Sequence, residues 1–220
     1  MPKTKEEKIE HSRLMVEFDS LFGYDLIAGV DEAGRGPLAG PVFAGAVILP
    51  TDCAIEGIDD SKKLSEKKRE ELFELITEKA IAWAVASVDE KEIDEINIRN
   101  ATYKAMNMAV NSLKAMPEYV IVDGDAVTNM EIPHMCVIKG DAKSRSIAAA
   151  SILAKVSRDR YLMELDKQYP EYQFAKHKGY GTKLHTEMIL KYGPCPIHRR
   201  TFLKKLLDEE KVVNIEAAAK

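Results

Sequence analysis

A stretch near the N-terminus combines residue types that are suited to binding a divalent cation. It reads IAGVDEAGRGP from Ile27 to Pro37, so an apolar run is followed at once by the carboxylates of Asp31 and Glu32. An unpaired charge at the end of a buried strand costs several kcal/mol. A hard divalent cation, which prefers oxygen ligands, would offset that cost. We therefore interpret the stretch as a metal-binding strand end.

Two further strand-like segments are followed by an acidic residue. Asp123 follows the apolar run 119–122, and Asp141 comes shortly after the apolar segment 135–138. Ligands collect where the carboxyl ends of strands leave an open α/β sheet. Two divalent ions about 4 Å apart would neutralise such a cluster and hold the attacking and leaving oxygens of a phosphodiester. A turn is the alternative for Asp123 and Asp141, because each adjoins a glycine and both residue types favour turns.

The loop after the first acidic pair carries an arginine between two glycines. Around Arg35, Gly34 and Gly36 allow backbone angles closed to other residues and let a ligand approach the main chain closely. The dinucleotide fingerprint GxGxxG does not fit, because the next glycine, Gly40, comes one position late and Pro37 intervenes. The loop is therefore expected to touch a substrate with its backbone.

Two segments nearer the C-terminus carry side chains suited to nucleic acid. Ser151, Lys155 and Arg158 are spaced i, i+4 and i+7 on a predicted helix, so they share one face that could meet phosphate. Tyr180 lies in the basic segment 174–181 and could stack on a sugar or base while neighbouring lysines meet phosphate. The alternatives are a simple polar surface for the helix and a packing role for Tyr180.

Alternating strands and helices must position these side chains. The expected strands cover residues 24–30, 42–49, 81–88, 119–123 and 135–138. The expected helices cover residues 3–22, 66–80, 89–116, 142–169, 182–192 and 201–210, with a loop at 172–181. Early hairpin strands followed by alternating helices and strands predict an α/β protein with a mixed five-stranded sheet flanked by helices. The predicted apolar side of the first helix consists of Ile9, Leu14, Val16, Phe18 and Leu21.

Composition narrows the class of protein. Hydrophobic residues make up 45% and charged residues 31% of the 220 residues, which is ordinary for a globular protein with a proper core. No run approaches the roughly 18 apolar residues of a membrane span, and residues 1–22 lack the apolar core of a signal peptide. Three cysteines at unrelated spacings form no metal or disulfide pattern, which favours a reducing cytoplasm.

The charge of the chain is unevenly distributed. The net charge is −4, yet residues 139–205 carry 15 Lys and Arg against 6 Asp and Glu, a local balance of +9 that leaves −13 for the rest. A basic C-terminal third is consistent with phosphate binding, and a solvated helical face is the alternative. We expect a core at 23–170, an N-terminal helical extension at 1–22, a helical substrate-contacting part at 171–210 and a tail at 211–220.

Taken together, these motifs resemble those of ribonuclease HII, the type 2 family of ribonucleases H. The family's sequence blocks occur in order and span nearly all of residues 24–205. They are GVDEAGRGPLAGPV from Gly29, DSKKL from Asp60, VDG from Val122, KGD from Lys139 with the alanine-rich helix to Asp159, HKGYGT from His177 and YGP from Tyr192. Any one block could be accidental, but the ordered set is highly specific.

The resemblance implies a fold, an activity and a cofactor. The fold is ribonuclease-H-like with a helical C-terminal part. The activity is endonucleolytic cleavage of RNA in RNA–DNA hybrids and of single ribonucleotides in duplex DNA, leaving 5′-phosphate and 3′-hydroxyl ends. Mg²⁺ or Mn²⁺ would be the cofactor, and Asp31, Glu32, Asp123 and Asp141 match the family's four acidic active-site residues.

The resemblance also implies substrate-binding residues. Gly34, Arg35 and Gly36 match the loop that reads the ribose 2′-hydroxyl at an RNA-to-DNA junction, and Tyr180 matches the tyrosine that packs against the sugar on the DNA side. The 2′-hydroxyl is the group that distinguishes RNA from DNA at a single position. Backbone groups that approach the ribose closely are therefore suited to recognising it. The further residues expected to contact substrate are Lys62, Ser151, Lys155 and Arg158.

Two other functions compete with this interpretation. A different two-metal nuclease or junction resolvase on the same fold would need the clustered acids but would not explain a loop that reads a 2′-hydroxyl. A non-catalytic binder of hybrid duplexes would bring four carboxylates to phosphate without a purpose. Nothing in the sequence demands an oligomer, so a monomer is the default expectation.

Overall fold

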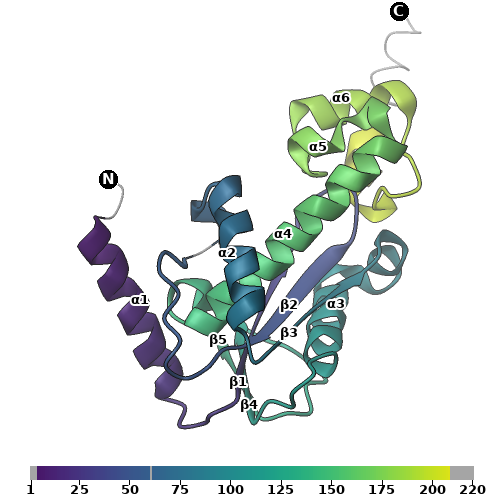
Figure 1. Ribbon diagram of the computed structural model, residues 1–220. Coiled ribbons are helices and arrows are strands. Elements are labelled where there is room, and N and C mark those ends of the chain that lie inside the picture. Colours follow the sequence, from purple (N-terminus) through teal and green to yellow (C-terminus); the bar gives the residue numbers. More distant parts are fainter. Residues whose placement is uncertain (1–3, 60, 209–220) are drawn as a thin grey trace, which may run out of the picture.

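One mixed sheet forms the centre of the protein. The structure, a computed structural model, describes residues 4–59 and 61–208 (Figure 1). The sheet has five strands in the order β3-β2-β1-β4-β5. The strands are β1 (Ile27–Ala33), β2 (Val42–Ile48), β3 (Ala82–Val88), β4 (Tyr119–Asp123) and β5 (His134–Val137). β1, β2 and β3 pair antiparallel, whereas β1 with β4 and β4 with β5 are parallel. The expected mixed five-stranded sheet is confirmed.

Helices surround the sheet and extend beyond it at the C-terminal end. The α-helices are α1 (Lys5–Ser20), α2 (Glu66–Lys79), α3 (Glu90–Asn111), α4 (Arg145–Gln168), α5 (Phe174–His177) and α6 (Lys183–Tyr192). Short 3-10 turns are η1 (Ser61–Lys63), η2 (Gly140–Ala142) and η3 (Pro170–Tyr172), and residues 200–208 are also helical. Within the described part of the chain, no helix has the length and apolar character that crossing a membrane requires.

The two faces of the sheet are covered by different helices. α3 packs against the even-numbered side chains of β2, including Ala44 and Ala46. α4 packs on the opposite face, where Val47 of β2 and Met15 of α1 join it together with α2. Figure 1 shows α4 running diagonally across the sheet and on to α5 and α6. α4 therefore connects the sheet with the C-terminal helices.

The approach of α4 to the sheet is very close. A Cβ atom on Gly29 of β1 would lie 2.1 Å from the backbone carbon of Ser146. A Cβ atom on Gly45 of β2 would lie 2.5 Å from the carbonyl oxygen of Ala150. Glycine in the strands and alanine in the helix are therefore both needed, because any larger side chain would push α4 off the sheet.

The packing face of α1 differs from the expected one. Ile9 and Leu14 are 51% and 50% exposed, whereas Ser12, Met15 and Asp19 face inward. The physical reason is that α1 docks partly through polar contacts. The Asp19 carboxylate accepts hydrogen bonds of 3.0 and 2.8 Å from the amide and hydroxyl of Ser146, at the start of α4. An apolar pattern alone could not identify that face.

Several element boundaries also differ from the expectations. β1 begins at Ile27 rather than at residue 24 and continues to Ala33, so Asp31 and Glu32 lie within the strand. The expected loop at 172–181 contains α5, and the helix expected from residue 142 starts at Arg145 after a 3-10 turn. The expected tail at 211–220, the first three residues, Asp60 and the predicted helix end at 209–210 lie outside the described residues.

Candidate active site

Two of the predicted acids lie side by side on neighbouring strands. The register of the parallel pair β1–β4 places Val30 opposite Val122, so Asp31 and Asp123 are the next residues on adjacent strands. Asp31 is only 3% exposed, and the side chain of Glu32 is 16% exposed. Two carboxylates from residues 92 positions apart in sequence therefore meet at the same edge of the sheet, next to Glu32.

Burial and mutual repulsion perturb these carboxylates. The pKa of Asp31 is raised well above its ordinary value, first by burial and then by the negative charges of Glu32 and Asp123. Hydrogen bonds from the Ser151 hydroxyl and from the Glu32 backbone amide (2.7 Å) oppose this rise. The protein thus gathers negative charge where water cannot screen it fully, which is common at functional sites.

Glu32 is surrounded by charges of both signs. Burial raises its pKa most, and the negative charge of Asp123 adds to that rise. The guanidinium of Arg35, 3.5 Å from Glu32 Oε1, lowers this pKa, as does the ammonium of Lys62. Arg35 and the exposed Lys62 are therefore cations whose charges act on Glu32.

Asp141 lies in the turn that follows β5 and is 8% exposed. Lys139, just before this turn, adopts a left-handed conformation with φ of 56°. The next amide, that of Gly140, donates a 2.6 Å hydrogen bond to Asp123 Oδ1. The turn that carries Asp141 is therefore fastened directly to the third acid of the cluster.

The acidic cluster suits a divalent cation in charge and ligand type. Carboxylate oxygens are the preferred ligands of hard cations such as Mg²⁺, and a cation would offset the repulsion that raises the pKa of Asp31 and Glu32. In residues 4–59 and 61–208, no three His, Cys, Asp or Glu side chains are arranged to hold an ion together as they stand. The fit is thus one of chemistry, carried above all by Asp31, whose buried carboxylate faces the negative charges of Glu32 and Asp123.

The glycine–arginine–glycine loop follows β1 directly. Gly34 is buried with φ of +98°, and a Cβ atom there would lie 2.1 Å from Arg158 Nε, so only glycine fits. Arg35 and Gly36 are exposed. The loop thus presents its outer two residues to solvent beside Glu32, while its base is packed against a buried arginine.

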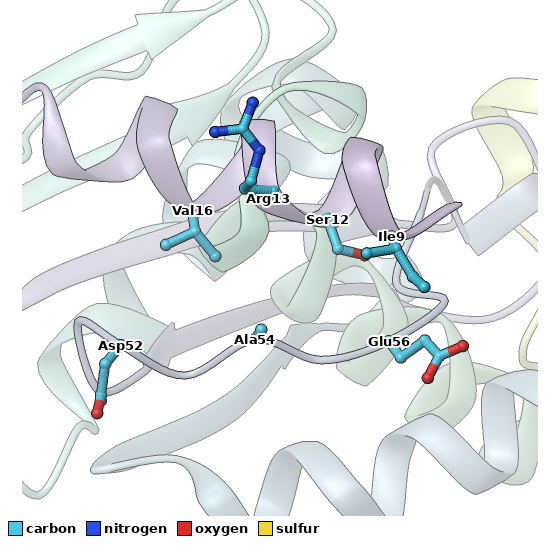
Figure 2. A pocket seen from close by; sticks show the side chains of 7 residues that line it. All are labelled: Ile9, Ser12, Arg13, Val16, Asp52, Ala54 and Glu56. Atoms are coloured by element: carbon cyan, nitrogen blue, oxygen red, sulfur yellow. The ribbon is translucent and has the colours of Figure 1, made fainter. Parts of the chain in front are cut away.

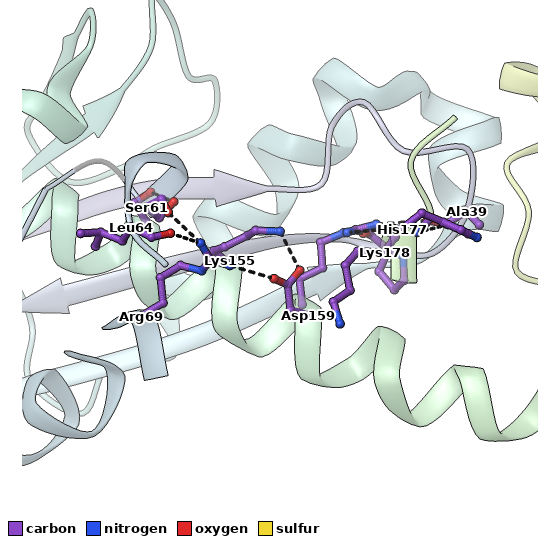
Figure 3. A network of polar contacts seen from close by, with 12 residues as sticks. Ala39, Ser61, Leu64, Arg69, Lys155, Asp159, His177 and Lys178 are labelled. Atoms are coloured by element: carbon purple, nitrogen blue, oxygen red, sulfur yellow. Dashed lines mark hydrogen bonds and ion pairs between the residues drawn. The ribbon is translucent and has the colours of Figure 1, made fainter. Parts of the chain in front are cut away.

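A polar network holds η1, the turn that carries Lys62, against α4 (Figure 3). Arg69 donates to the carbonyl oxygens of Ser61 (3.1 Å) and Leu64 (2.6 Å), and its guanidinium lies 3.8 Å from Asp159. Lys155 donates to the same Asp159 at 2.7 Å. Asp159 therefore joins the Lys62 turn to the helix face that was predicted to meet phosphate.

Of the residues on that predicted face, only Lys155 keeps a partly exposed side chain, at 17%. Ser151 is 2% exposed; its hydroxyl lies 2.9 Å from that of Ser61 and hydrogen bonds to Asp31. Ser151 therefore contacts the acidic cluster rather than solvent.

The expectation that Arg158 meets phosphate is wrong for this structure. Its side chain is fully buried and donates to the carbonyl oxygens of Pro41 (3.2 Å), Lys178 (2.9 Å) and Ala39 (3.1 Å). The spacing i, i+7 correctly placed Arg158 on the same side of α4 as Ser151. It could not reveal that residues 38–41 and 177–180 fold over that end of the helix.

Tyr180 lies on the surface beside the same helix. It is 42% exposed, and the Lys155 ammonium lies 5.8 Å from the centre of its ring. The guanidinium carbon of Arg158 lies 5.9 Å from the same centre. An exposed aromatic face with a neighbouring lysine is suited to a sugar and its phosphate.

Sequence reasoning missed the residues that hold the loop after β1 and the segment around Tyr180 in place. Arg199 is fully buried and donates to backbone carbonyls of the 34–40 loop, and buried His185 and His198 lie beneath Tyr180. No signal in the sequence distinguishes Arg199 from its exposed neighbour Arg200.

A separate groove of about 400 Å³ lies between α1 and residues 52–56 (Figure 2). Its lining includes Ile9, Val16 and Ala54 together with the charged side chains of Arg13 and Glu56. None of the predicted site residues lines it, so it is not part of the candidate active site.

Comparison with known proteins places the chain in one family. The family model described as Ribonuclease HII matches residues 28–205. Ribonuclease HII of Caldicellulosiruptor saccharolyticus is 59% identical over 84% of this chain and 90% of that protein. Ribonuclease HII of Clostridioides difficile is 53% identical over 93% of this chain and 80% of that protein.

Solved structures agree with the sequence relatives. Ribonuclease H2 from Pyrococcus horikoshii superposes with a TM-score of 0.70 and 32% identity, covering 83% of this chain and 97% of that one. The Archaeoglobus fulgidus RNase HII, solved as a complex with PCNA, gives a TM-score of 0.66 and 28% identity, with 80% of this chain and 94% of that chain covered. The chain therefore belongs to the ribonuclease HII family and is a metal-dependent endoribonuclease that acts on RNA–DNA hybrids.

Proposed function

We propose that this ribonuclease HII cuts on the 5′ side of single ribonucleotides embedded in duplex DNA, as well as within longer RNA tracts, leaving 5′-phosphate and 3′-hydroxyl ends. The observation that carries the proposal is the position of the exposed Arg35 and Gly36 in the loop that begins two residues after the acidic pair Asp31–Glu32. A loop that can read a 2′-hydroxyl thus adjoins the carboxylates that would act on the neighbouring phosphodiester.

We propose that Asp31, Glu32, Asp123 and Asp141 hold two divalent ions, Mg²⁺ or Mn²⁺. When bound, such ions supply an activated water for attack on phosphorus and stabilise the departing 3′ oxygen. The protein contributes the rigid edge of the sheet that brings the carboxylates together and the Gly140–Asp123 hydrogen bond that orients one of them. It also excludes water from Asp31, which strengthens every electrostatic interaction at this point.

The substrate would be held by groups around the acidic cluster. We propose that the backbone of Gly34, Arg35 and Gly36 reads the 2′-hydroxyl and that the ring of Tyr180 packs on the sugar that follows. The exposed Lys62, whose charge acts on Glu32, and the partly exposed Lys155, 5.8 Å from the centre of the Tyr180 ring, would meet phosphates. The helical part at 171–210 would then be the substrate-contacting part of a monomeric cytoplasmic enzyme.

A junction resolvase on the same fold and a non-catalytic hybrid binder are the competing functions. The resolvase has no use for a loop that discriminates a 2′-hydroxyl. The binder would be hindered by the buried negative charge of Asp31, because carboxylates without a cation repel phosphate. Both alternatives therefore predict behaviour that a single cleavage assay distinguishes.

The test uses a DNA duplex with one embedded ribonucleotide, incubated with Mg²⁺, with Mn²⁺ and with a chelator. We expect one metal-dependent cut on the 5′ side of the ribonucleotide and none in the chelator. Cleavage of long hybrids alone would overturn the junction-reading role of the 34–36 loop. No cleavage of any substrate by the folded, metal-supplied protein would favour the binding module.

A further inference from the structure

Arg199 is fully buried and uses its guanidinium to hold one loop. Its Nε donates to the carbonyl oxygen of Gly40 at 2.9 Å, and its two terminal nitrogens donate to those of Arg35 (2.9 Å) and Gly34 (2.7 Å). All three acceptors lie in the loop that follows β1, more than 150 residues earlier in sequence. The three donor atoms of the side chain thus converge on a single segment.

Arg158 holds the other end of the same segment. It donates to the carbonyl oxygens of Ala39 and Pro41 and, through its third nitrogen, to that of Lys178. Lys178 stands two residues before Tyr180, so Arg158 connects the loop after β1 with the segment that carries the tyrosine. Two buried arginines together fix the carbonyls of the 34–41 loop and its spacing from Tyr180.

The hydrogen bonds of Arg199 determine which way the loop amides point. In a trans peptide unit the C=O group and the following N–H group point in opposite directions. Because the carbonyls of Gly34 and Arg35 are turned inward to Arg199, the N–H groups of Arg35 and Gly36 are turned away from it. Arg35 and Gly36 are the exposed residues of the loop, so their amides face the side from which a substrate would arrive.

The arrangement requires an arginine, and burying its charge opposes folding. A guanidinium offers five donor hydrogens in a rigid plane, whereas the single nitrogen of a lysine cannot reach three divergent carbonyls. Burial, and next the positive charge of Arg158, lower the pKa of Arg199. Burying two neighbouring cations opposes folding, and an apolar side chain would fill the same space without that penalty. A packing role alone does not explain two such arginines.

We propose that Arg199 is a positioning residue for ribonucleotide recognition, which holds the amides of Arg35 and Gly36 in the orientation that meets the 2′-hydroxyl. Arg158 sets the distance between this loop and Tyr180. This inference rests on the proposed function, in which the same loop reads the 2′-hydroxyl. The inference adds that Arg199 enables the loop to discriminate a ribonucleotide from a deoxyribonucleotide, although Arg199 itself contacts no substrate.

The test measures discrimination in binding, in the non-cleaving Asp31→Asn background. The affinity for a duplex with one ribonucleotide is compared with that for the same all-DNA duplex, in Mg²⁺. Arg199→Lys is expected to reduce this preference at least about tenfold while leaving the affinity for all-DNA duplex within about twofold, since one lost bidentate contact changes discrimination by about that amount. Arg200→Lys, the same change at the exposed neighbouring residue, is the matched control and should keep the preference.

A second variant guards against misfolding. Arg199→Gln removes the buried charge, so it should remain folded, and its amide can satisfy at most two of the three carbonyls. It is expected to lose the preference as Arg199→Lys does, with faster hydrogen exchange at residues 34–41 in both. A lower melting temperature with an unchanged preference in these variants would show that Arg199 only stabilises the fold, and would overturn the proposal.

Failure of the proposed function gives a different pattern. If the Asp31→Asn protein with Arg199 intact already binds both duplexes equally, the loop does not read the 2′-hydroxyl. That result overturns the function and the inference together. It is recognised without any Arg199 variant, so it cannot be confused with a failure of Arg199 alone.

Discussion

The backbone amide of Gly140 donates a 2.6 Å hydrogen bond to the Asp123 carboxylate. This bond joins the end of β4 to the turn after β5, and Asp141 is the next residue of that turn. One oxygen of Asp123 is thereby oriented, and the position of Asp141 is tied to it. Hydrogen bonds to an ionised acceptor are stronger than neutral ones, so this contact sets the geometry of half of the acidic cluster.

Gly140→Ala should lower the affinity for metal strongly and the thermal stability of the protein less. The new Cβ atom would lie 3.3 Å from Asp123 Oδ1 and 2.5 Å from Ile147 Cδ1, so the carboxylate and the isoleucine must both shift. Changing an outer partner of a metal ligand lowers metal affinity about 10- to 100-fold. The measurement is the Mg²⁺ concentration that gives half-maximal cleavage, together with the melting temperature.

Ile147→Val provides the control for Gly140→Ala, because it removes the Cδ1 atom that the new methyl group would strike. The double variant should recover most of the lost stability but not the lost metal affinity. Full recovery of both would show that the effect came from crowding at Ile147 and that the Gly140–Asp123 bond does not orient the site.

Asp31→Asn should abolish cleavage and stabilise the metal-free protein. The substitution removes a buried negative charge that Glu32 and Asp123 repel. Relief of such repulsion is worth on the order of 1 kcal/mol, or about 2–4 °C in melting temperature for a chain of this size. Scanning calorimetry with and without Mg²⁺ measures both effects, and Asp52→Asn on the exposed surface is the control. Cleavage at the normal rate by Asp31→Asn would refute the metal assignment.

The acidic cluster and the main elements could be predicted because they depend on local pattern. An apolar run that ends in an acid defined β4 with its observed bounds, Tyr119–Asp123, and placed Asp31 and Asp123 at one edge of the sheet. Parallel pairing of β1 and β4 follows from the general preference of alternating strands and helices. The sequence itself therefore carried the information that brings these acids together.

The supporting residues could not be predicted because their roles depend on distant segments. Arg158 and Lys155 lie on the same helix, and the packing of residues 38–41 and 177–180 against α4 buries the first and leaves the second partly exposed. Arg199 acquires its role from carbonyls of a loop at the other end of the chain. Side-chain type and helical spacing contain no record of such tertiary contacts, so buried and exposed arginines look alike.

Tyr180→Ala should impair cleavage of single-ribonucleotide substrates more than cleavage of long hybrids. The exposed ring lies beside Lys155, where it can pack on one sugar at the junction. Loss of a stacking contact costs about 1–3 kcal/mol, so we expect a fall of about 5- to 150-fold in kcat/KM on the single-ribonucleotide duplex. On long hybrids, where many registers are productive, the fall should be several times smaller. Equal losses on both substrates, with Tyr192→Ala as the surface control, would assign Tyr180 to packing.

The histidines beneath Tyr180 should make the stability of the protein sensitive to acid. The Cys195 amide donates to His198 Nδ1 at 3.0 Å, so His198 must carry its proton on Nε2 and donate to His185 Nε2, 3.1 Å away. His185 then donates through Nδ1 to the carbonyl oxygen of Tyr180 at 3.0 Å. Both rings are therefore neutral, and a proton added to either would set two N–H groups against each other.

Burial lowers the pKa of both His185 and His198 from 6.5 to about 4. As the pH falls from 6.5 toward 4, the two histidines therefore bind protons in the unfolded chain but stay unprotonated in the folded protein. The free energy of unfolding decreases as a result. The stabilisation is complete above pH 6.5 and is lost through this window. Each ring should account for about 1–2 kcal/mol of the difference between pH 7 and pH 5, and the two contributions are not additive because the rings share a hydrogen bond.

Urea unfolding at pH 7 and pH 5 measures this dependence in the native protein and in His185→Gln. The variant should be less stable at pH 7, because the hydrogen bond to the Tyr180 carbonyl is weakened. It should nevertheless lose less stability on acidification, because it lacks one of the two histidines whose pKa is lowered in the folded protein. His134→Gln changes an exposed histidine on β5 and should retain the native pH dependence. If His185→Gln loses as much stability between pH 7 and pH 5 as the native protein does, His185 is not a source of the acid sensitivity and this prediction is wrong.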